Sequence, residues 1–427
     1  MKYLIIVPDG SADRPDVSSG KTPLDEAHMP NFQKLATHGE VGLVKNIPDG
    51  IPPASDAANL AVMGYDPEKD LTGRSPLEAG SMGLTMSNTD VSFRTNLVTF
   101  ATENKESDAY EDRIIIDHSA GDITNEEAAE IIRFLDEKLG FGNPKNGGRA
   151  RFFPGVSYRH ILMIEDGDFP TESGIGNVVA ELAGYKLTPP HDILTQRIGD
   201  YLPKGEGSEF ILDMMRESSR LLQDHPVNRS RAERGLNTAD GIWIWGEGTR
   251  PSLESFKTKF GIEGSVISAV DLIKGIGVFA GLNPVSVEGA TGTLTSNFAG
   301  KATAAIREFE SGRDFVYIHV EAPDECSHQG NRSEKIKAIE IIDQVVAEPV
   351  LKYLEEKGED YRVLVVPDHR TPLALRTHSD EPVPFVLYDS RDARERKGQT
   401  FSESSGGKGT YFSSGKALAE YFFRAPK

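Results

Sequence analysis

The stretch that decides the fold is Val363-Leu-Val-Val-Pro-Asp-His-Arg-Thr-Pro-Leu-Ala-Leu-Arg-Thr-His378. Its first four residues are apolar and predict a buried strand, which ends at Pro367. Asp368 and His369 follow at once, and His378 lies nine residues beyond His369. Parallel-sheet proteins place their chemistry at the carboxyl ends of strands. Carboxylates and imidazoles are ligands for Mn, Zn or Fe, so this strand end is a candidate metal site.

The 427-residue chain has the composition of a globular protein, with 38% hydrophobic and 26% charged residues. Its length suits two or three domains. The net charge of −19 argues against nucleic acid or an anionic membrane as the main partner. No apolar run approaches the ~18 residues of a membrane span, and residues 1–9 lack a signal-peptide cleavage site. The single cysteine, Cys326, excludes an internal disulfide, so we expect a cytoplasmic protein.

Predicted strands and helices alternate in both end regions of the chain. The predicted strands there are residues 3–7, 41–44, 242–245, 266–268, 315–320, 363–366 and 385–388. This rhythm predicts an α/β domain with a mostly parallel sheet and helices on both faces. Between the end regions, residues 90–100 alternate like a half-exposed strand, and residues 125–139 predict an amphipathic helix. We therefore expect a discontinuous core domain (residues 1–83 and 240–427) with an inserted α+β domain (residues 84–239).

Acidic residues and histidines also follow two other predicted strands. Asp9 follows residues 3–7, and Asp324 and His328 follow residues 315–320. A single helical turn would place Asp324 and His328 on one side, because they are four positions apart. Together with the opening stretch, these segments supply three carboxylates and three imidazoles, which suits two divalent ions. Each strand end alone is also typical of a helix cap or a turn, and the joint pattern favours the metal site.

Ser55 is the candidate nucleophile. It follows the stiff Pro52-Pro-Ala turn and opens a predicted Ala-rich helix. A serine in this place is commonly an N-cap. A helix N-terminus also attracts phosphate, and a nearby metal ion can activate a hydroxyl group. The residues alone leave both interpretations open, and the neighbouring metal motifs favour the nucleophile.

Two basic features stand out in this acidic chain. The segment Asn228-Arg-Ser-Arg-Ala-Glu-Arg234 holds three arginines. Such a cluster is usually a solvated face, but it also suits bidentate binding of phosphate or carboxylate. Lys274 lies near the start of an otherwise apolar predicted helix, which is a weaker indication of function.

Six motifs carry a resemblance to a known family: Pro8-Asp-Gly10, Pro53-Ala-Ser-Asp-Ala-Ala-Asn59, Thr72-Gly-Arg-Ser-Pro76, Pro154-Gly-Val-Ser-Tyr-Arg159, Glu321-Ala-Pro-Asp-Glu-Cys-Ser-His328 and Pro367-Asp-His-Arg-Thr-Pro372. In this order they resemble the archaeal-type branch of the cofactor-independent phosphoglycerate mutases, which belong to the alkaline phosphatase superfamily. The likeness covers essentially the whole chain. It implies an alkaline-phosphatase-like central sheet and an inserted substrate-binding domain that acts as a lid.

The resemblance also implies roles for individual residues. One metal ion would be held by Asp9, Ser55, Asp368 and His369, and the other by Asp324, His328 and His378. Ser55 would become phosphorylated, and Lys274 would be a catalytic lysine close to the metals. The substrate-binding residues would be Arg231 and Arg234, with His118 and Arg159 in segments that line the substrate side.

The activity implied is the interconversion of 3-phosphoglycerate and 2-phosphoglycerate in glycolysis, through a phosphoserine and with two divalent ions (Mn, Zn or Mg). Two other enzymatic hypotheses share the metal motifs: phosphate transfer to homoserine, as in a bacterial subgroup that resembles homoserine kinases, and metal-dependent phosphatase chemistry. A non-enzymatic metal-binding scaffold would have an incomplete ligand set, whereas every ligand position is filled here. We expect a small phosphorylated substrate and neither a nucleic-acid nor a membrane partner, and the oligomeric state stays open.

Overall fold

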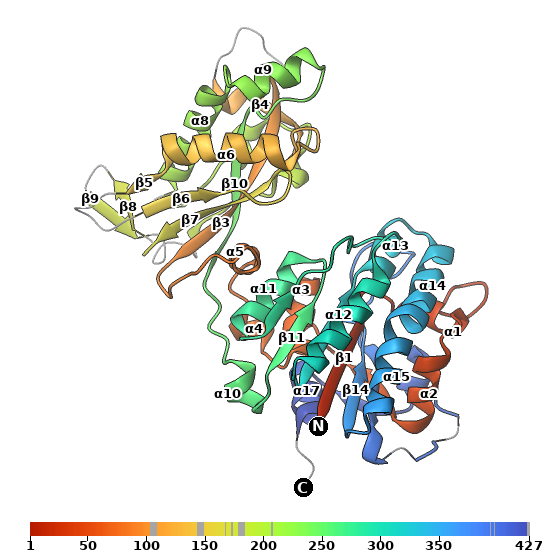
Figure 1. Ribbon diagram of the computed structural model, residues 1–427. Helices are drawn as coiled ribbons and strands as arrows, with labels where there is room; N and C mark the ends of the chain where they lie inside the picture. Colours follow the sequence, from red (N-terminus) through yellow and green to blue (C-terminus); the bar gives the residue numbers. More distant parts are fainter. Residues whose placement is uncertain are drawn as a thin grey trace. The chain divides into compact units, whose positions relative to one another are not determined.

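The computed structural model describes residues 1–102, 109–142, 149–166, 168–171, 174–177, 184–205, 208–392, 394–396 and 398–424 (Figure 1). The chain divides into two compact units. The first unit joins Met1–Leu71 with Ser252–Lys427, and the second is Thr72–Pro251. The first unit is thus built from both ends of the chain, with the second inserted between them.

The first unit contains an eight-stranded sheet, and seven of its strands run in one direction. From edge to edge the strands are β12 (Asn283–Val285), β11 (Gly264–Ile267), β13 (Phe315–Val320), β1 (Lys2–Pro8), β14 (Tyr361–Val365), β15 (Val383–Asp389), β2 (Glu40–Val44) and β16 (Thr410–Phe412). Only β15 is antiparallel to its neighbours. The predicted α/β class with a mostly parallel sheet is confirmed.

Helices cover both faces of this sheet (Figure 1). They are α1 (Pro23–Glu26), α2 (Pro30–His38), α3 (Ser55–Val62), α4 (Pro67–Asp70), α10 (Phe256–Phe260), α11 (Asp271–Phe279), α12 (Phe298–Glu310), α13 (Ala322–His328), α14 (Arg332–Ile341), α15 (Glu348–Lys357), α16 (Glu403–Gly406) and α17 (Gly415–Phe423). A π-helical segment, η5 (Ile342–Ala347), joins α14 to α15, and η6 (Ser390–Asp392) follows β15. The helical run over residues 334–356 is interrupted just before Pro349, which has no N–H to donate.

Alternate residues of the central strand β1 face opposite layers of helices. Leu4 and Ile6 are fully buried in a core to which α2, α12, α14 and α15 also contribute. Tyr3 lies on the other face, where its ring contacts Phe422 and Phe423 of α17. Each buried aliphatic side chain of this kind contributes about 1.5–3 kcal/mol through removal from water. Burial on both faces explains why the strand is an unbroken apolar run rather than an alternating one.

The second unit is built on a six-stranded antiparallel sheet. Its strands are β10 (Gly241–Thr249), β3 (Val91–Thr102), β4 (Arg113–Asp117), β7 (Arg159–Glu165), β6 (Arg149–Phe153) and β5 (Phe141–Gly142), with β8 (Asp168–Thr171) and β9 (Gly174–Asn177) forming a separate hairpin. The helices are α5 (Arg74–Ser81), α6 (Asn125–Leu139), α8 (Glu209–Leu222) and α9 (Pro226–Glu233), with the 3₁₀ turns η1 (Tyr110–Asp112), η3 (Pro190–Ile193) and η4 (Ile198–Tyr201).

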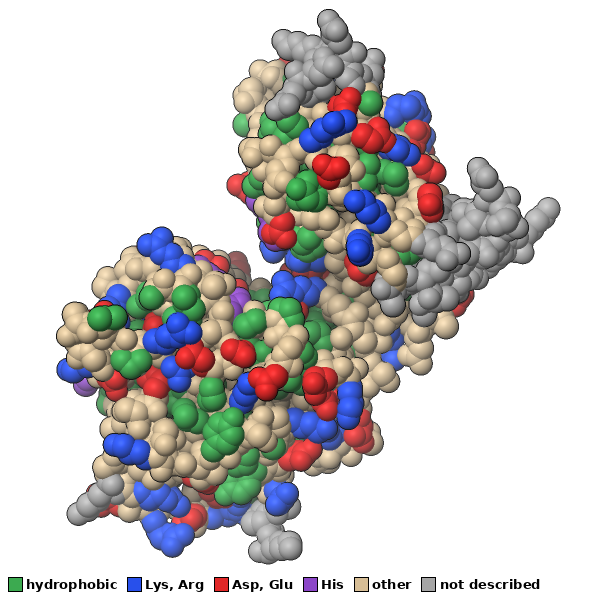
Figure 2. Space-filling model, turned by 180° about the vertical axis from the view of Figure 1, so that it is seen from behind, with side chains coloured by type: hydrophobic (Ala, Val, Ile, Leu, Met, Phe, Trp, Pro, Cys, Tyr) green, Lys and Arg blue, Asp and Glu red, His purple; other side chains and the backbone are tan. Residues whose placement is uncertain are grey.

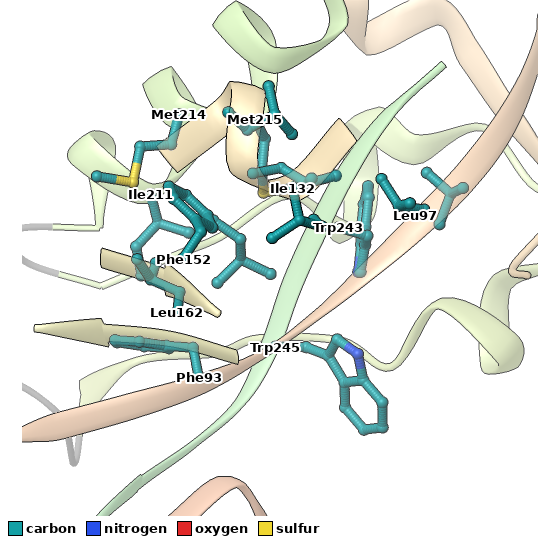
Figure 3. Packing of buried hydrophobic residues seen from close by; sticks show 14 of the residues in the cluster. Phe93, Leu97, Ile132, Phe152, Leu162, Ile211, Met214, Met215, Trp243 and Trp245 are labelled. Atoms are coloured by element: carbon teal, nitrogen blue, oxygen red, sulfur yellow. The ribbon is translucent and has the colours of Figure 1, made fainter. Parts of the chain in front are cut away.

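The core of the second unit lies between its sheet and its helices (Figure 3). Phe152 and Leu162 of the sheet pack with Ile211 and Met214 of α8. The indole of Trp245 points away from these residues. It donates a hydrogen bond to Asn96 Oδ1 at 3.0 Å and lies 4.4 Å from the Arg94 guanidinium. This antiparallel sheet with helices is the α+β architecture expected for the insertion.

The edges of the compact units differ from the expected domain limits of residues 84–239. Strand β10 pairs antiparallel with β3, from Gly241 with Val98 to Thr249 with Val91, and therefore belongs to the second unit. Helix α5 packs against β3 and β10 and joins the same unit. The sequence assigned both segments to the core domain, because a short apolar strand and a Gly-punctuated segment do not reveal their pairing partners.

Charged side chains of both signs are interspersed on the face of each unit that Figure 2 shows. A polyanion such as nucleic acid is bound by clustered Lys and Arg. The face shown therefore differs from the purely basic surface that a polyanion requires.

Candidate metal and phosphotransfer site

Three adjacent parallel strands of the first unit place their following residues at one edge of the sheet. Strands β13, β1 and β14 are neighbours, with β1 in the centre. Asp9 follows β1, and Asp368 and His369 come shortly after β14. Helix α13, which begins directly after β13, carries Asp324 and His328. The structure thus brings the residues predicted from three strand ends into one region.

Asp9, Asp368 and His369 form the first ligand group. Their ligand atoms all lie within 4.8 Å of one another, and all three side chains are buried. His369 Nε2 is 3.5 Å from Asp9 Oδ1 and 3.4 Å from Asp368 Oδ2. The Asn59 amide donates to Asp368 Oδ2 at 2.8 Å and thereby orients that carboxylate.

Ser55 joins this first group through its hydroxyl oxygen, which lies 3.0 Å from His369 Nε2. Ser55 is the first residue of α3, and Ala54, which has no side-chain hydrogen bond, occupies the N-cap. The hydroxyl is therefore not used to cap its own helix. Of the two interpretations that the sequence left open, the structure disfavours the cap.

Asp324, His328 and His378 form the second group. His328 Nε2 lies 3.0 Å from Asp324 Oδ2, and His378 Nε2 lies 3.4 Å from Asp324 Oδ1. The Nε2 atoms of the two imidazoles are 3.1 Å apart. Their Nδ1 atoms are held by backbone carbonyls, that of His328 by Arg376 and that of His378 by Pro53. All three side chains thus direct ligand atoms toward one point.

The two groups are contiguous. The ring centres of His369 and His378 are 4.1 Å apart. Asp324, His369 and His378 also offer ligand atoms within 4.8 Å of one another. His369 can therefore face either group, whereas the family resemblance placed it with Asp9, Asp368 and Ser55 alone.

The electrostatics of the first group suit a cation. Burial, together with repulsion from the Asp368 and Asp324 carboxylates, raises the pKa of Asp9 well above its ordinary value. Asp9 Oδ1 is buried without a hydrogen-bond partner among the described residues. A divalent ion bound here would relieve the repulsion and satisfy that oxygen. The donor set of carboxylates and imidazoles therefore fits a divalent metal.

Burial alone would raise the pKa of Asp324, but hydrogen bonds from His328 and His378 outweigh it and hold that pKa well below the ordinary value. The hydrogen bond to Asp324 raises the pKa of His328 to about 9. The second group is thus a carboxylate between two imidazoles, and a metal ion that bound His328 at neutral pH would have to displace a proton from that ring.

His319 also lies at this site, although it is not part of any of the predicted strand-end motifs. Its Nε2 atom is 3.0 Å from Asp9 Oδ2, without hydrogen-bond geometry. Burial lowers the pKa of His319 to about 3, so the ring is neutral. A signal for His319 was its position near the end of an apolar strand. The strand register pairs His319 with Val7, which lies two residues before Asp9.

Lys274 occupies the first turn of α11, where its ammonium group pairs with Asp271 at 2.7 Å. Its side chain is 17% exposed. Helix α11 packs against α3, the helix that begins with Ser55. A catalytic role for Lys274 stays a prediction.

The two predicted arginines of the second unit have different environments. Arg231 is 2% exposed, and its guanidinium donates to the Asn237 and Ala120 carbonyls and to the Glu127 carboxylate. Arg234 is half exposed and pairs with the same Glu127. These contacts give Arg231 a structural role and leave only Arg234 open to solvent. Substrate binding by either residue stays a prediction.

His118 and Arg159 lie near each other in the second unit. The His118 ring contacts Tyr158 edge-on at 5.5 Å, and the Arg159 guanidinium lies 5.6 Å from the Tyr158 ring centre. His118 also contacts His191, which in turn contacts Trp245. Substrate binding by His118 and Arg159 is likewise still a prediction.

Known proteins resemble this chain over nearly its whole length. Residues 36–228 match the family described as 2,3-bisphosphoglycerate-independent phosphoglycerate mutase. A protein of that name from Methanosarcina barkeri is 43% identical over 411 residues, which is 96% of each chain. The chain belongs to the 2,3-bisphosphoglycerate-independent phosphoglycerate mutase family. A probable mutase of this family from Geobacter sulfurreducens is also 43% identical, over 95% of each chain.

Solved structures agree on the fold. A protein from Pyrococcus horikoshii aligns with a TM-score of 0.77 and 25% identity, over 100% of this chain and 98% of that one. The cofactor-independent phosphoglycerate mutase of Thermoplasma acidophilum aligns with a TM-score of 0.65 and 23% identity, over 99% of each chain.

The predicted family and enzyme class are confirmed. Membership implies dependence on divalent metal ions and a small phosphorylated substrate, and none of the described helices is long and apolar enough to cross a membrane.

Proposed function

We propose that this protein interconverts 3-phosphoglycerate and 2-phosphoglycerate through a phosphoserine at Ser55, without a bisphosphoglycerate cofactor. The relatives that share 43% identity over nearly the full chain carry the name of this activity. The observation that carries the phosphoserine part is the placement of the Ser55 hydroxyl, 3.0 Å from His369 Nε2 in the first ligand group.

The proposal includes two divalent ions, Mn, Zn or Mg. The first would be held by Asp9, Asp368, His369 and Ser55, and the second by Asp324, His328 and His378. Two observations support two ions: the groups share no carboxylate, and each contains a carboxylate with at least one imidazole. Bound ions would lower the pKa of the Ser55 hydroxyl and neutralise charge on the transferred phosphoryl group.

The reaction then consists of two opposite displacements. The Ser55 oxygen forms a bond to phosphorus while the bond from phosphorus to the glycerate oxygen breaks. The proton that leaves Ser55 is balanced by the proton that the released glycerate hydroxyl gains. The neighbouring glycerate hydroxyl then attacks the phosphoserine, which restores Ser55. Asn59 holds the start of α3 for both steps, because its amide donates to the Ser55 carbonyl and to Asp368.

The second unit supplies the remaining part of the proposal. We assign binding of the glycerate to this unit, through Arg234, His118 and Arg159. The exposure of Arg234 and Arg159 and the partial exposure of His118 support the assignment. A glycolytic role in the cytoplasm is part of the same proposal.

The direct test supplies 3-phosphoglycerate to the purified protein without bisphosphoglycerate, before and after removal of metal by a chelator. A parallel reaction contains homoserine and a phosphoryl donor. We expect 2-phosphoglycerate from the first reaction only, and no product after chelation until a divalent ion is restored. Product from homoserine alone would replace the mutase with a kinase, and release of free phosphate alone would indicate a phosphatase.

A further inference from the structure

Thr371 lies between the two ligand groups and contacts both. Its hydroxyl is 2.5 Å from Asp324 Oδ1, in the second group. The same hydroxyl is 3.1 Å from Nδ1 of His369, in the first group. The Thr371 side chain is completely buried, so water does not compete for these contacts.

The single hydroxyl proton fixes the direction of both hydrogen bonds. A metal-binding carboxylate carries no proton and can only accept, so Thr371 donates to Asp324. The hydroxyl oxygen is then left as an acceptor toward the ring of His369. His369 must therefore carry its proton on Nδ1, and its Nε2 atom presents a lone pair toward Ser55 and the first ligand group.

We propose that Thr371 is a positioning residue whose hydroxyl joins the two ligand groups and holds His369 in the tautomer that binds metal through Nε2. A histidine ligand commonly donates its second N–H to an outer partner, which fixes the ring and strengthens the ligand. Here the outer partner also binds a ligand of the neighbouring group. Loss of this hydroxyl would therefore weaken both groups.

The backbone around Thr371 is anchored from the loop that follows β1. The Thr371 N–H donates to the Ala12 carbonyl at 3.3 Å. The ammonium group of Lys335, which is fully buried, donates to the Thr371 carbonyl at 3.0 Å and pairs with Asp13 at 2.8 Å. These contacts fix the hydroxyl against both partners, so the hydrogen bonds do not depend on a mobile loop.

The inference rests on the metal-binding part of the proposed function and not on the identity of the substrate. Metal content of the unaltered protein tests that part separately. If the unaltered protein bound no divalent ion, the metal site itself would be wrong, whatever the role of Thr371.

The first experiment compares Thr371→Val, which removes the hydroxyl at nearly constant shape, with Thr371→Ser, which keeps it. Mn²⁺ and Zn²⁺ affinities are measured by chelator competition, and ion content by elemental analysis. We expect Thr371→Val to lose about 10- to 100-fold in affinity and Thr371→Ser to stay within a few-fold of the unaltered protein. Equal affinities for all three proteins, or equal losses in both variants, would overturn the proposal.

The second experiment needs no variant and holds even if Thr371→Val fails to fold. The ring nitrogens of the histidines are labelled with ¹⁵N in the metal-free, unaltered protein, and His369 is assigned with a His369→Gln sample. We expect the His369 proton on Nδ1. A proton on Nε2 of the neutral ring would contradict the proposed hydrogen-bond direction. A purely structural threonine would leave metal affinity unchanged even if it altered the melting temperature.

Discussion

The Ser55 hydroxyl lies 3.0 Å from Nε2 of His369, although the two residues are 314 positions apart in the chain. The contact joins the first turn of α3 to the segment that follows β14. Asn59, one turn along α3, reinforces it by donating to Asp368 Oδ2, and the Tyr317 hydroxyl in turn donates to Asn59. Ser55, the proposed nucleophile, and the first ligand group are therefore held by one hydrogen-bond network.

Gly10 is expected to be essential for the shape of the ligand groups. It has φ of +62°, and a Cβ there would lie 2.6 Å from both Asp324 Oδ1 and Thr371 Oγ1. Gly20 has φ of +69° with nothing within 4 Å, so it is a matched control for backbone strain alone. We expect Gly20→Ala to cost about 1–2 kcal/mol and leave metal binding intact. Gly10→Ala should cost more and lower Mn²⁺ affinity, as measured by urea unfolding and chelator competition. Equal effects of the two substitutions would contradict this packing.

Metal uptake by the second group should release protons near neutral pH. The hydrogen bond to Asp324 raises the pKa of His328 to about 9, so the ion-free ring is protonated at about pH 7.5. An ion binds only the neutral ring, so apparent affinity should rise with pH and level off above about pH 9. Because the pKa of His328 is higher in the folded state than in the unfolded state, protonation of this ring stabilises the ion-free fold. This contribution is fully present below the ordinary histidine pKa and is lost as the pH rises through about 9.

Calorimetry in buffers of different ionisation enthalpy measures the released protons. We expect about one proton from His328 at pH 7.5, and a correspondingly smaller release from His328→Asn. If His328→Asn released as many protons as the unaltered protein, the assignment of the proton to this ring would be wrong.

Arg231 and Arg234 should differ sharply although they are three positions apart. Arg231→Met breaks a buried pair with Glu127 and two carbonyl contacts, so the free energy of unfolding should fall by about 3–5 kcal/mol. Arg234→Met removes a half-exposed pair and should cost less than about 1 kcal/mol. If Arg234 binds substrate as proposed, its loss should raise KM about tenfold. A large stability loss in Arg234→Met with unchanged KM would reverse these roles.

The sequence predicted most of the site because the ligands follow strands that read as unbroken apolar runs. Asp9, Asp324, Asp368 and His369 come together because β13, β1 and β14 are adjacent and parallel. The sequence did not distinguish Ser55 from an N-cap, since only the folded structure shows that Ala54 occupies the cap.

Other features depend on contacts between distant segments and carry no local signal. The burial of Arg231 requires Glu127, which is 104 positions away. The pairing of β10 with β3 places Trp243 in the second unit, although its apolar run equally suits the parallel sheet. The role proposed for Thr371 depends on one hydroxyl that contacts both Asp324, 47 positions away in the chain, and His369, two positions away.

The central claim is that the phosphoryl group resides on Ser55 during turnover. The most direct measurement mixes the metal-loaded protein with 3-phosphoglycerate, quenches the reaction with acid within the first turnovers and maps phosphorylated peptides by mass spectrometry. We predict phosphate on Ser55 in the unaltered protein. The Ser55→Ala variant should carry none, should lose at least about a thousandfold in turnover and should keep the Asp324, His328 and His378 ion. A Ser55→Ala protein that still interconverts the phosphoglycerates, or a phosphopeptide that excludes Ser55, would contradict the account.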